Sequence, residues 1–149
     1  MALQSVGTNG WEARPLQSKA SMSVATAALT ASQALDLAVK AAAAVEDPSG
    51  WLRTGDRASS KVSFSVRDMT RDGTEHVLFF DVELDRAVGR VTVRTIITSY
   101  VTRSSGMSAL VPVSKRKISG FSTYRAFMDG YAKLLKQADP AASVSFSGT

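Results

Sequence analysis

Alternating apolar and polar residues mark three strands in the middle of the chain, over residues 61–68, 75–84 and 90–103. An Asp72-Gly73 pair separates the first two strands, and a loop over 85–89 that ends in glycine separates the second from the third. Turns of this kind join antiparallel strands. The pattern therefore predicts an antiparallel meander, and its apolar face is formed by Val62, Phe64, Val66, Leu78, Phe80, Val82, Leu84, Val91, Val93, Ile97 and Val101.

A strand and a helix are predicted before the meander. Residues 20–29 are small and apolar without a charge, which is typical of a strand. Thr30 and Gln33 then have the spacing of a capping box, in which each side chain satisfies a free backbone N–H at a helix start. The Asp47-Pro48-Ser49-Gly50 stretch stops the helix, because proline and glycine do not continue one. We expect Trp51-Leu52 to cover its end.

A second, longer helix is predicted near the C-terminal end. Ser119 or Ser122 can cap its start, and Asp139-Pro140 ends it. Its apolar positions recur at spacings of three and one, so one side of the helix must lie on an apolar surface. Those positions are Phe121, Tyr124, Phe127, Met128, Tyr131, Leu134 and Leu135.

Together these elements predict an α+β fold in the order β-α-β-β-β-β-α. A fifth strand is expected at 108–113, and a short further one can form at 143–146. The long C-terminal helix should pack on one face of a curved antiparallel sheet of about five strands. We expect a loosely ordered arm at 1–18, a single domain at 19–140 and a polar tail at 141–149.

The order of elements resembles the helix-grip folds of the START and Bet v 1-like superfamily. In those proteins a C-terminal helix closes the concave side of an antiparallel sheet around an apolar cavity. The resemblance covers roughly residues 20–138 and rests on element order, without a motif; a TATA-binding-protein-like half fold has a similar order. The chain is short and has one convincing helix where the superfamily usually has two, so the resemblance implies a small cavity or none.

The amino-acid composition excludes most familiar types of catalytic site. The 149 residues include no cysteine and one histidine, which excludes disulfides, cysteine-ligated metals, thiol nucleophiles and any two-histidine metal site. His76 and Glu75 are adjacent in a strand and point to opposite faces, so they are a poor acid–base pair. Asp81 and Glu83 share a face, but neighbouring arginines can pair with them. The sequence predicts a cytoplasmic, non-enzymatic domain without metal, cofactor or membrane span.

The leading functional hypothesis is binding of an apolar or amphipathic small molecule between the sheet and the C-terminal helix. Two hydroxyls on an apolar wall could orient such a ligand. The alternative is that the aromatic residues simply fill the core. The candidate lining residues are Phe64, Phe80, Val93, Thr95, Ile97, Ser99, Tyr124, Phe127, Met128 and Tyr131.

A second hypothesis, from a different class, is a homodimeric interaction module that uses the opposite sheet face. Apolar residues on that face (Val77, Phe79, Ile96 and Tyr100) form a larger patch than an isolated domain usually exposes. Arg67 and Arg94 can pair with Asp81 and Glu83 across strands, or Arg94 can pair with those acids of a second copy. The candidate interface residues are Phe79, Arg94, Ile96 and Tyr100. Burial of this face beneath the N-terminal arm and Trp11 is the alternative.

A third hypothesis concerns charge. The formal net charge is +5, and residues 103–138 hold seven basic residues against one acidic residue. Such a segment could attract phosphate or nucleic acid. Its Lys115-Arg116-Lys117 run has no aromatic residue among the bases, so we favour protection of a sheet edge, and nucleic acid is an unexpected partner.

Overall fold

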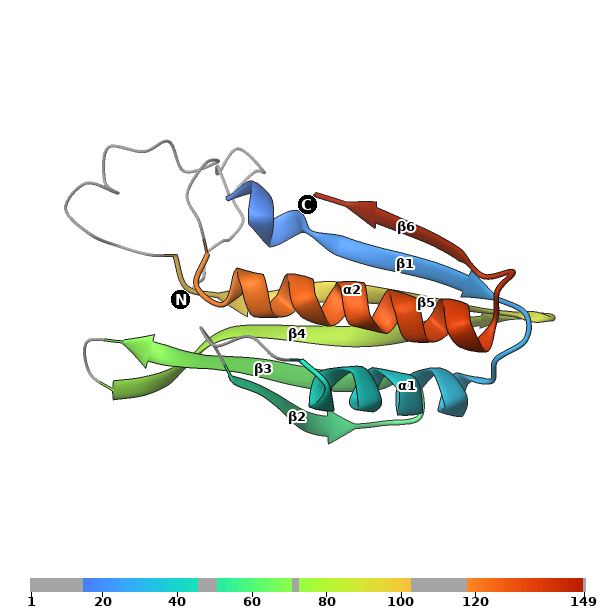
Figure 1. Ribbon diagram of the computed structural model, residues 1–149, viewed down its shortest axis with the longest axis horizontal. Helices are drawn as coiled ribbons and strands as arrows, with labels where there is room; N and C mark the ends of the chain where they lie inside the picture. Colours follow the sequence, from blue (N-terminus) through green and yellow to red (C-terminus); the bar gives the residue numbers. More distant parts are fainter. Residues whose placement is uncertain (1–14, 46–50, 71–72, 103–117, 149) are drawn as a thin grey trace.

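The protein folds into a six-stranded antiparallel sheet with both long helices on one side (Figure 1). The computed structural model describes residues 15–45, 51–70, 73–102 and 118–148. The elements follow in the order of a short 3-10 helix (Leu16–Lys19), β1 (Ser21–Thr26), α1 (Ala31–Ala43), β2 (Trp51–Arg57), β3 (Lys61–Thr70), β4 (Gly73–Ala87), β5 (Arg90–Tyr100), α2 (Phe121–Ala138) and β6 (Ser143–Ser147). The strands lie in the order β2-β3-β4-β5-β1-β6. The α+β class, the antiparallel sheet and the C-terminal helix are confirmed.

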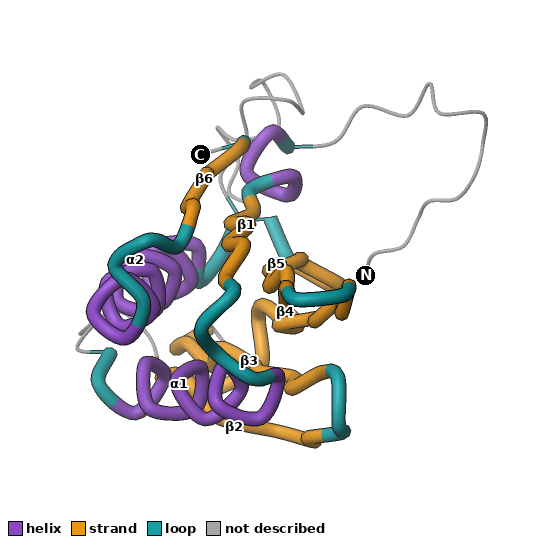
Figure 2. The backbone as a smooth tube through the Cα atoms, turned by 90° about the vertical axis from the view of Figure 1, so that its right-hand side faces the viewer, coloured by secondary structure: helices purple, strands orange, loops and turns teal. Residues whose placement is uncertain are grey.

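The sheet curls around α1 and α2, as the view along the strands shows (Figure 2). The side away from the helices is called the outer face below. It carries Ser63, Ser65, Arg67, His76, Phe79, Asp81, Glu83, Arg94, Ile96 and Ser99.

The two edge strands of the described sheet compare differently with the prediction. The short strand expected at 143–146 is confirmed as β6, which pairs with β1, so the predicted tail adds an edge to the sheet. β2 was not predicted. Its side chains are almost all exposed, so it lacks the alternating pattern by which strands are recognised. The strand expected at 108–113 lies outside the described residues.

The first helix begins as predicted. The backbone N–H of Gln33 donates to Thr30 Oγ1 (3.1 Å), and the N–H of Thr30 donates to Gln33 Oε1 (2.9 Å). The buried side of α1 is made mainly of alanine and includes Ala34, Ala38 and Ala41. Small side chains let the helix approach its neighbours closely, which brings the backbone of α1 within reach of α2.

The cap expected for the second helix was wrong. The N-cap is Gly120, with a φ of +80°, and neither Ser119 nor Ser122 takes that position. A Cβ at residue 120 would lie 3.0 Å from Val66 Cγ1 and 3.1 Å from Val77 Cγ2. Glycine therefore allows both the left-handed turn and the close approach to the sheet.

Two shifts in strand register make some residues face the opposite side of the sheet from the one predicted. One lies between Val66 and Arg67 on β3, where Arg67 pairs with His76, so that Val77 turns inward and is only 4% exposed. The other shift lets Phe80 pair with Ile97 and Phe79 with Ser99. An extra residue in one strand reverses the alternation beyond it.

Three predictions fail as a consequence of the second shift. Tyr100 packs against the core and not on the outer face. Ser99 lies opposite the exposed Phe79 and so faces outward. Val101, expected in the core, is about half exposed.

Asp139 links the end of α2 to the end of β1 through hydrogen bonds. Its buried carboxylate accepts hydrogen bonds from Thr26 Oγ1 (2.5 Å) and from the N–H of Ala141 (3.1 Å). The Thr26 hydroxyl is the main reason that the pKa of Asp139 lies below its ordinary value of 3.8. The ionised carboxylate is thus the form that the fold prefers.

We expect the stability of Asp139→Asn to fall less than that of the wild type as the pH is lowered. A lowered folded pKa contributes stability that is complete above the unfolded value of 3.8 and is lost as the pH falls through the folded value. Denaturant midpoints measured between about pH 6 and about pH 3 should fall less in Asp139→Asn than in the wild type. Asp129→Asn, on the exposed side of α2, is the control. An equal acid dependence in wild type and Asp139→Asn would contradict this role.

Candidate functional site

The space between the sheet and α2 is filled by aromatic rings. Phe64 and Phe80 from the sheet stack with ring centroids 5.2 Å apart, and Phe127 from α2 lies 5.1 Å and 5.0 Å from them. Tyr124 lies 4.8 Å from Phe80, and Tyr131 lies 5.4 Å from Phe127. All five side chains are at most 1% exposed. The predicted lining residues therefore come together, and they form packed core.

The hydroxyls in this core are engaged by the protein itself. The N–H of Met22 donates to Thr95 Oγ1 (2.8 Å), which lies 2.9 Å from the Tyr124 hydroxyl, and that hydroxyl donates to the carbonyl oxygen of Ala20 (2.7 Å). Since Tyr124 gives its proton to Ala20, Thr95 donates to Tyr124. This chain of hydrogen bonds joins β1, β5 and α2. It engages the Thr95 hydroxyl, which the sequence predicted to orient a ligand.

Burial keeps both tyrosines protonated. It raises the pKa of Tyr124 to about 12, against a smaller lowering by the hydrogen bond with Thr95. Burial also raises the pKa of Tyr131 well above its usual range, and its hydroxyl donates to the carbonyl oxygen of Ala34 on α1 (2.7 Å). Both groups act as structural donors at neutral pH.

Of the other predicted lining residues, all but Ser99 lie in or against the core. Val93 and Met128 are buried, and Met128 Sδ lies 3.6 Å from Thr95 Oγ1. Ile97 is partly buried against the core, whereas Ser99 faces outward. The described residues line open hollows elsewhere. One, of about 420 Å³, lies between the start of α1 and the β4–β5 turn, and one of about 440 Å³ lies beside Trp51 and Arg67.

The outer face carries exposed apolar side chains on neighbouring strands. Phe79 on β4 is 40% exposed and Ile96 on β5 is 41% exposed. The His76 ring stacks on Phe79 with centroids 5.5 Å apart. Neither α1 nor α2 lies on this side of the sheet (Figure 2). Phe79 and Ile96 therefore stay where the sequence placed them, while Tyr100 leaves the patch.

Charged side chains alternate across the same face. Arg94 on β5 approaches Glu83 on β4 (3.9 Å), as predicted, and Lys61 on β3 approaches Asp81 (3.9 Å). Arg67 makes neither of the pairs expected of it. It lies across from Trp51 on one side and His76 on the other, and its buried Nε has no hydrogen-bond partner among the described residues.

Sequence reasoning missed Trp51 as part of this face. β2 carries it beside β3, where the indole is 54% exposed and borders the hollow next to Arg67. Since β2 shows no alternation, the only available signal was the high strand propensity of a tryptophan. The outer face thus runs from Trp51 on β2 to Ile96 on β5.

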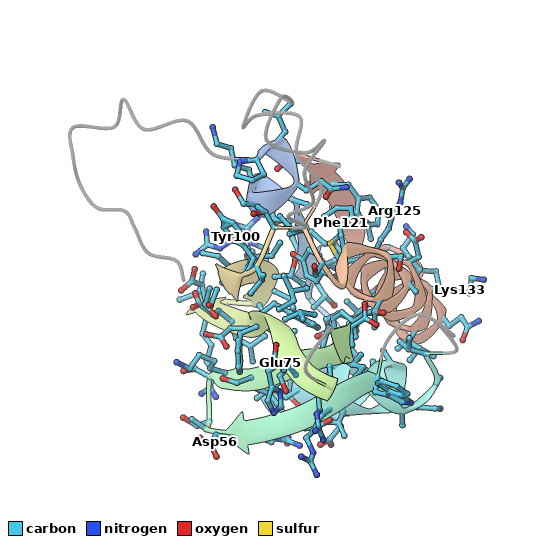
Figure 3. The ribbon with its side chains drawn as sticks, turned by 90° about the vertical axis from the view of Figure 1, so that its left-hand side faces the viewer. Asp56, Glu75, Tyr100, Phe121, Arg125 and Lys133 are labelled. Carbon is cyan, nitrogen blue, oxygen red and sulfur yellow. The ribbon has the colours of Figure 1, made fainter. Side chains whose placement is uncertain are left out.

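The other residues considered for catalysis, metal binding or anion binding do not form a common site within the described residues. His76 contacts the Phe79 ring, and no group of three metal-binding side chains occurs within the described ranges. Arg103 and 115–117 lie outside the described residues. Arg125 and Lys133 project away from the sheet (Figure 3), and Lys136 Nζ donates to the carbonyl oxygens of Pro140 and Ala142. In the part of the chain that the structure describes, no helix is long and apolar enough to cross a membrane.

The function must be inferred from this geometry alone, because the sequence matches no protein-family model and no curated protein.

Proposed function

We propose that the protein is an interaction module that forms a homodimer through the outer face. The observation that carries this proposal is the pair Phe79 and Ile96, two large apolar side chains about 40% exposed on adjacent strands. Exposed apolar clusters rimmed by polar residues are typical of contact surfaces. Trp51 enlarges the surface along the same face.

The charges on this face favour a second copy as the partner. The acids Asp81 and Glu83 lie on β4, and the bases Lys61 and Arg94 lie on the strands to either side. A copy related by a two-fold axis and displaced by one strand would set its bases over these acids, and the reverse, as isologous interfaces require. The existing pairs are long, at 3.9 Å, and can be shared with a partner at little cost.

Phe79→Glu is expected to convert the dimer to a monomer without loss of the fold. A carboxylate at the centre of the contact would have to be desolvated without a partner, which should weaken the dimer by about a hundredfold or more. Sedimentation velocity over a range of concentrations measures the change, and far-UV circular dichroism checks the fold.

Val88→Glu is the matched control for this variant. Val88 is fully exposed in the β4–β5 turn, so its substitution adds the same charge away from the proposed contact. The control should dimerise like the wild type. A monomeric wild type, or a Phe79→Glu variant that associates normally, would contradict the proposal.

The resemblance to helix-grip folds remains part of the proposal. It is supported by the position of both helices on the concave side of the sheet and by the order β2-β3-β4-β5-β1. Ligand binding in the interior would require the aromatic rings between the sheet and α2 to move apart. Phosphate or nucleic-acid binding through 103–138, and a cytoplasmic location, stay predictions from the sequence.

A further inference from the structure

The two edges of the sheet are unlike each other. β2 carries Arg53, Asp56 and Arg57, its register with β3 shifts between Thr54 and Arg57, and Arg57 forms a 2.8 Å salt bridge with Asp36 of α1. Charges and irregular pairing are the usual means by which proteins prevent a sheet edge from adding another strand. β2 is therefore a protected edge.

β6 has none of these features. Its sequence, Ser-Val-Ser-Phe-Ser, contains no charge and no proline, and it pairs with β1 in unbroken register over all five residues. Lys136, a basic side chain close to its start, is turned back onto the carbonyl oxygens of Pro140 and Ala142. The strand order places β6 at the end of the described sheet, with its second side free of any described strand.

We propose that β6 pairs antiparallel with β6 of a second copy, so that the two sheets become continuous. The strand has the same order of polar and apolar residues in both directions. A two-fold axis through Ser145 sets Val144 opposite Phe146 of the copy and Ser143 opposite Ser147 of the copy. Such pairing contains no like-charge contact and keeps the apolar residues on a single face.

Packing on the helix side supports this partner. Val144 and Phe146 pair with Val24 and Met22 of β1, which are fully buried, so they continue the apolar face of the sheet. The ring of Phe146 is nevertheless 43% exposed, because no described strand lies beyond it. Val144 of a second copy would cover that ring, as cross-strand apolar pairs do in a sheet.

The serines support the same partner on the other face. Ser143, Ser145 and Ser147 lie opposite Ala25, Ser23 and Ser21 of β1, and the hydroxyls of Ser21 and Ser147 are 3.2 Å apart. These side chains are small, so two copies can approach without a clash. The edge contact uses residues separate from Phe79 and Ile96, and it stands or falls independently of the proposed outer-face dimer.

Ser145→Lys tests the pairing, because it sets two lysines directly opposite each other at the two-fold axis. Like charges in this position should weaken association through β6 about tenfold or more. The matched control is Ser59→Lys, in the exposed turn between β2 and β3. Sedimentation of the full chain should show weaker association in Ser145→Lys than in the wild type and in Ser59→Lys.

A cysteine variant gives a second readout that does not depend on the effect of a lysine. The chain has no cysteine, so Ser145→Cys supplies a single thiol per copy. Directly opposite Cβ atoms in a sheet lie roughly 4.5–5.5 Å apart, close to the separation that a disulfide spans. Mild oxidation should therefore give a covalent dimer from Ser145→Cys and little from Ser59→Cys.

The proposal is overturned if Ser145→Lys associates like the wild type, if the wild type is monomeric, or if the two cysteine variants cross-link to the same extent. A wild type whose association is lost in Phe79→Glu but unchanged in Ser145→Lys would overturn the β6 contact alone. The reverse result would overturn the outer-face dimer alone.

Discussion

Phe127→Ala is expected to lower the free energy of unfolding by about 3–5 kcal/mol, the usual cost of removing a buried phenylalanine side chain. Phe127 is fully buried and contacts the rings of Phe64, Phe80 and Tyr131. Its loss removes apolar area from the core and leaves a cavity that neighbouring rings can fill only in part. Equilibrium unfolding in urea measures the change.

The same variant distinguishes a packed core from a ligand cavity. A ring that lined an empty cavity would make fewer contacts, and its removal would cost little. Phe79→Ala, studied at a concentration too low for association, is the control, because this ring is 40% exposed. A loss below about 1 kcal/mol for Phe127→Ala, similar to that of the control, would show that the interior is not tightly packed.

Thr95→Val is expected to cost about 1–3 kcal/mol, although valine has nearly the same shape as threonine. The substitution leaves the N–H of Met22 without its acceptor and the Tyr124 hydroxyl without its donor, inside a fully buried site. An unsatisfied buried donor carries its full desolvation cost. Thermal or urea unfolding measures the loss.

Two further variants identify the hydrogen bonds as the cause. Thr95→Ser keeps the hydroxyl and should recover a large part of the stability that Thr95→Val loses. Tyr124→Phe and the double variant complete a double-mutant cycle, in which the two losses should be less than additive because both residues belong to one chain of hydrogen bonds. Full additivity, or a negligible loss in Thr95→Val, would contradict this network.

Local sequence signals predicted most of the fold. The capping box at Thr30 places the start of α1, and the apolar spacing from Phe121 onward places α2 on the sheet. The β4–β5 turn falls at Gly89, within the loop expected to connect those strands. Each of these signals is contained in a few neighbouring residues, so it can be recognised without knowledge of the tertiary structure.

The parts that could not be predicted depend on distant residues. Val77 turns inward and packs against Gly120 at the start of α2, and β2 forms as an edge strand because β3 lies beside it. Alternation of residues along β5 contains no sign that Thr98 is an extra residue that shifts its register with β4. Face assignments beyond that point were therefore wrong for Tyr100.

The candidate site, like the fold, could be predicted only in part. An apolar stripe on α2 and an apolar face on the sheet were enough to predict that Phe64, Phe80, Tyr124 and Phe127 meet. Whether they enclose a ligand depends on whether the rings fill the space between them. The partners of Thr95 are the backbone groups of β1 and a tyrosine on α2, which no sequence pattern connects to it.

The most direct test is native mass spectrometry of the freshly purified full chain, because it reports subunit number and any retained small molecule together. We expect a dimer, or an assembly of an even number of chains if β6 also pairs, with no mass beyond that of the protein, and a lower subunit number for Phe79→Glu. A monomer carrying a small molecule that is released on denaturation would contradict the packed interior and the outer-face dimer together.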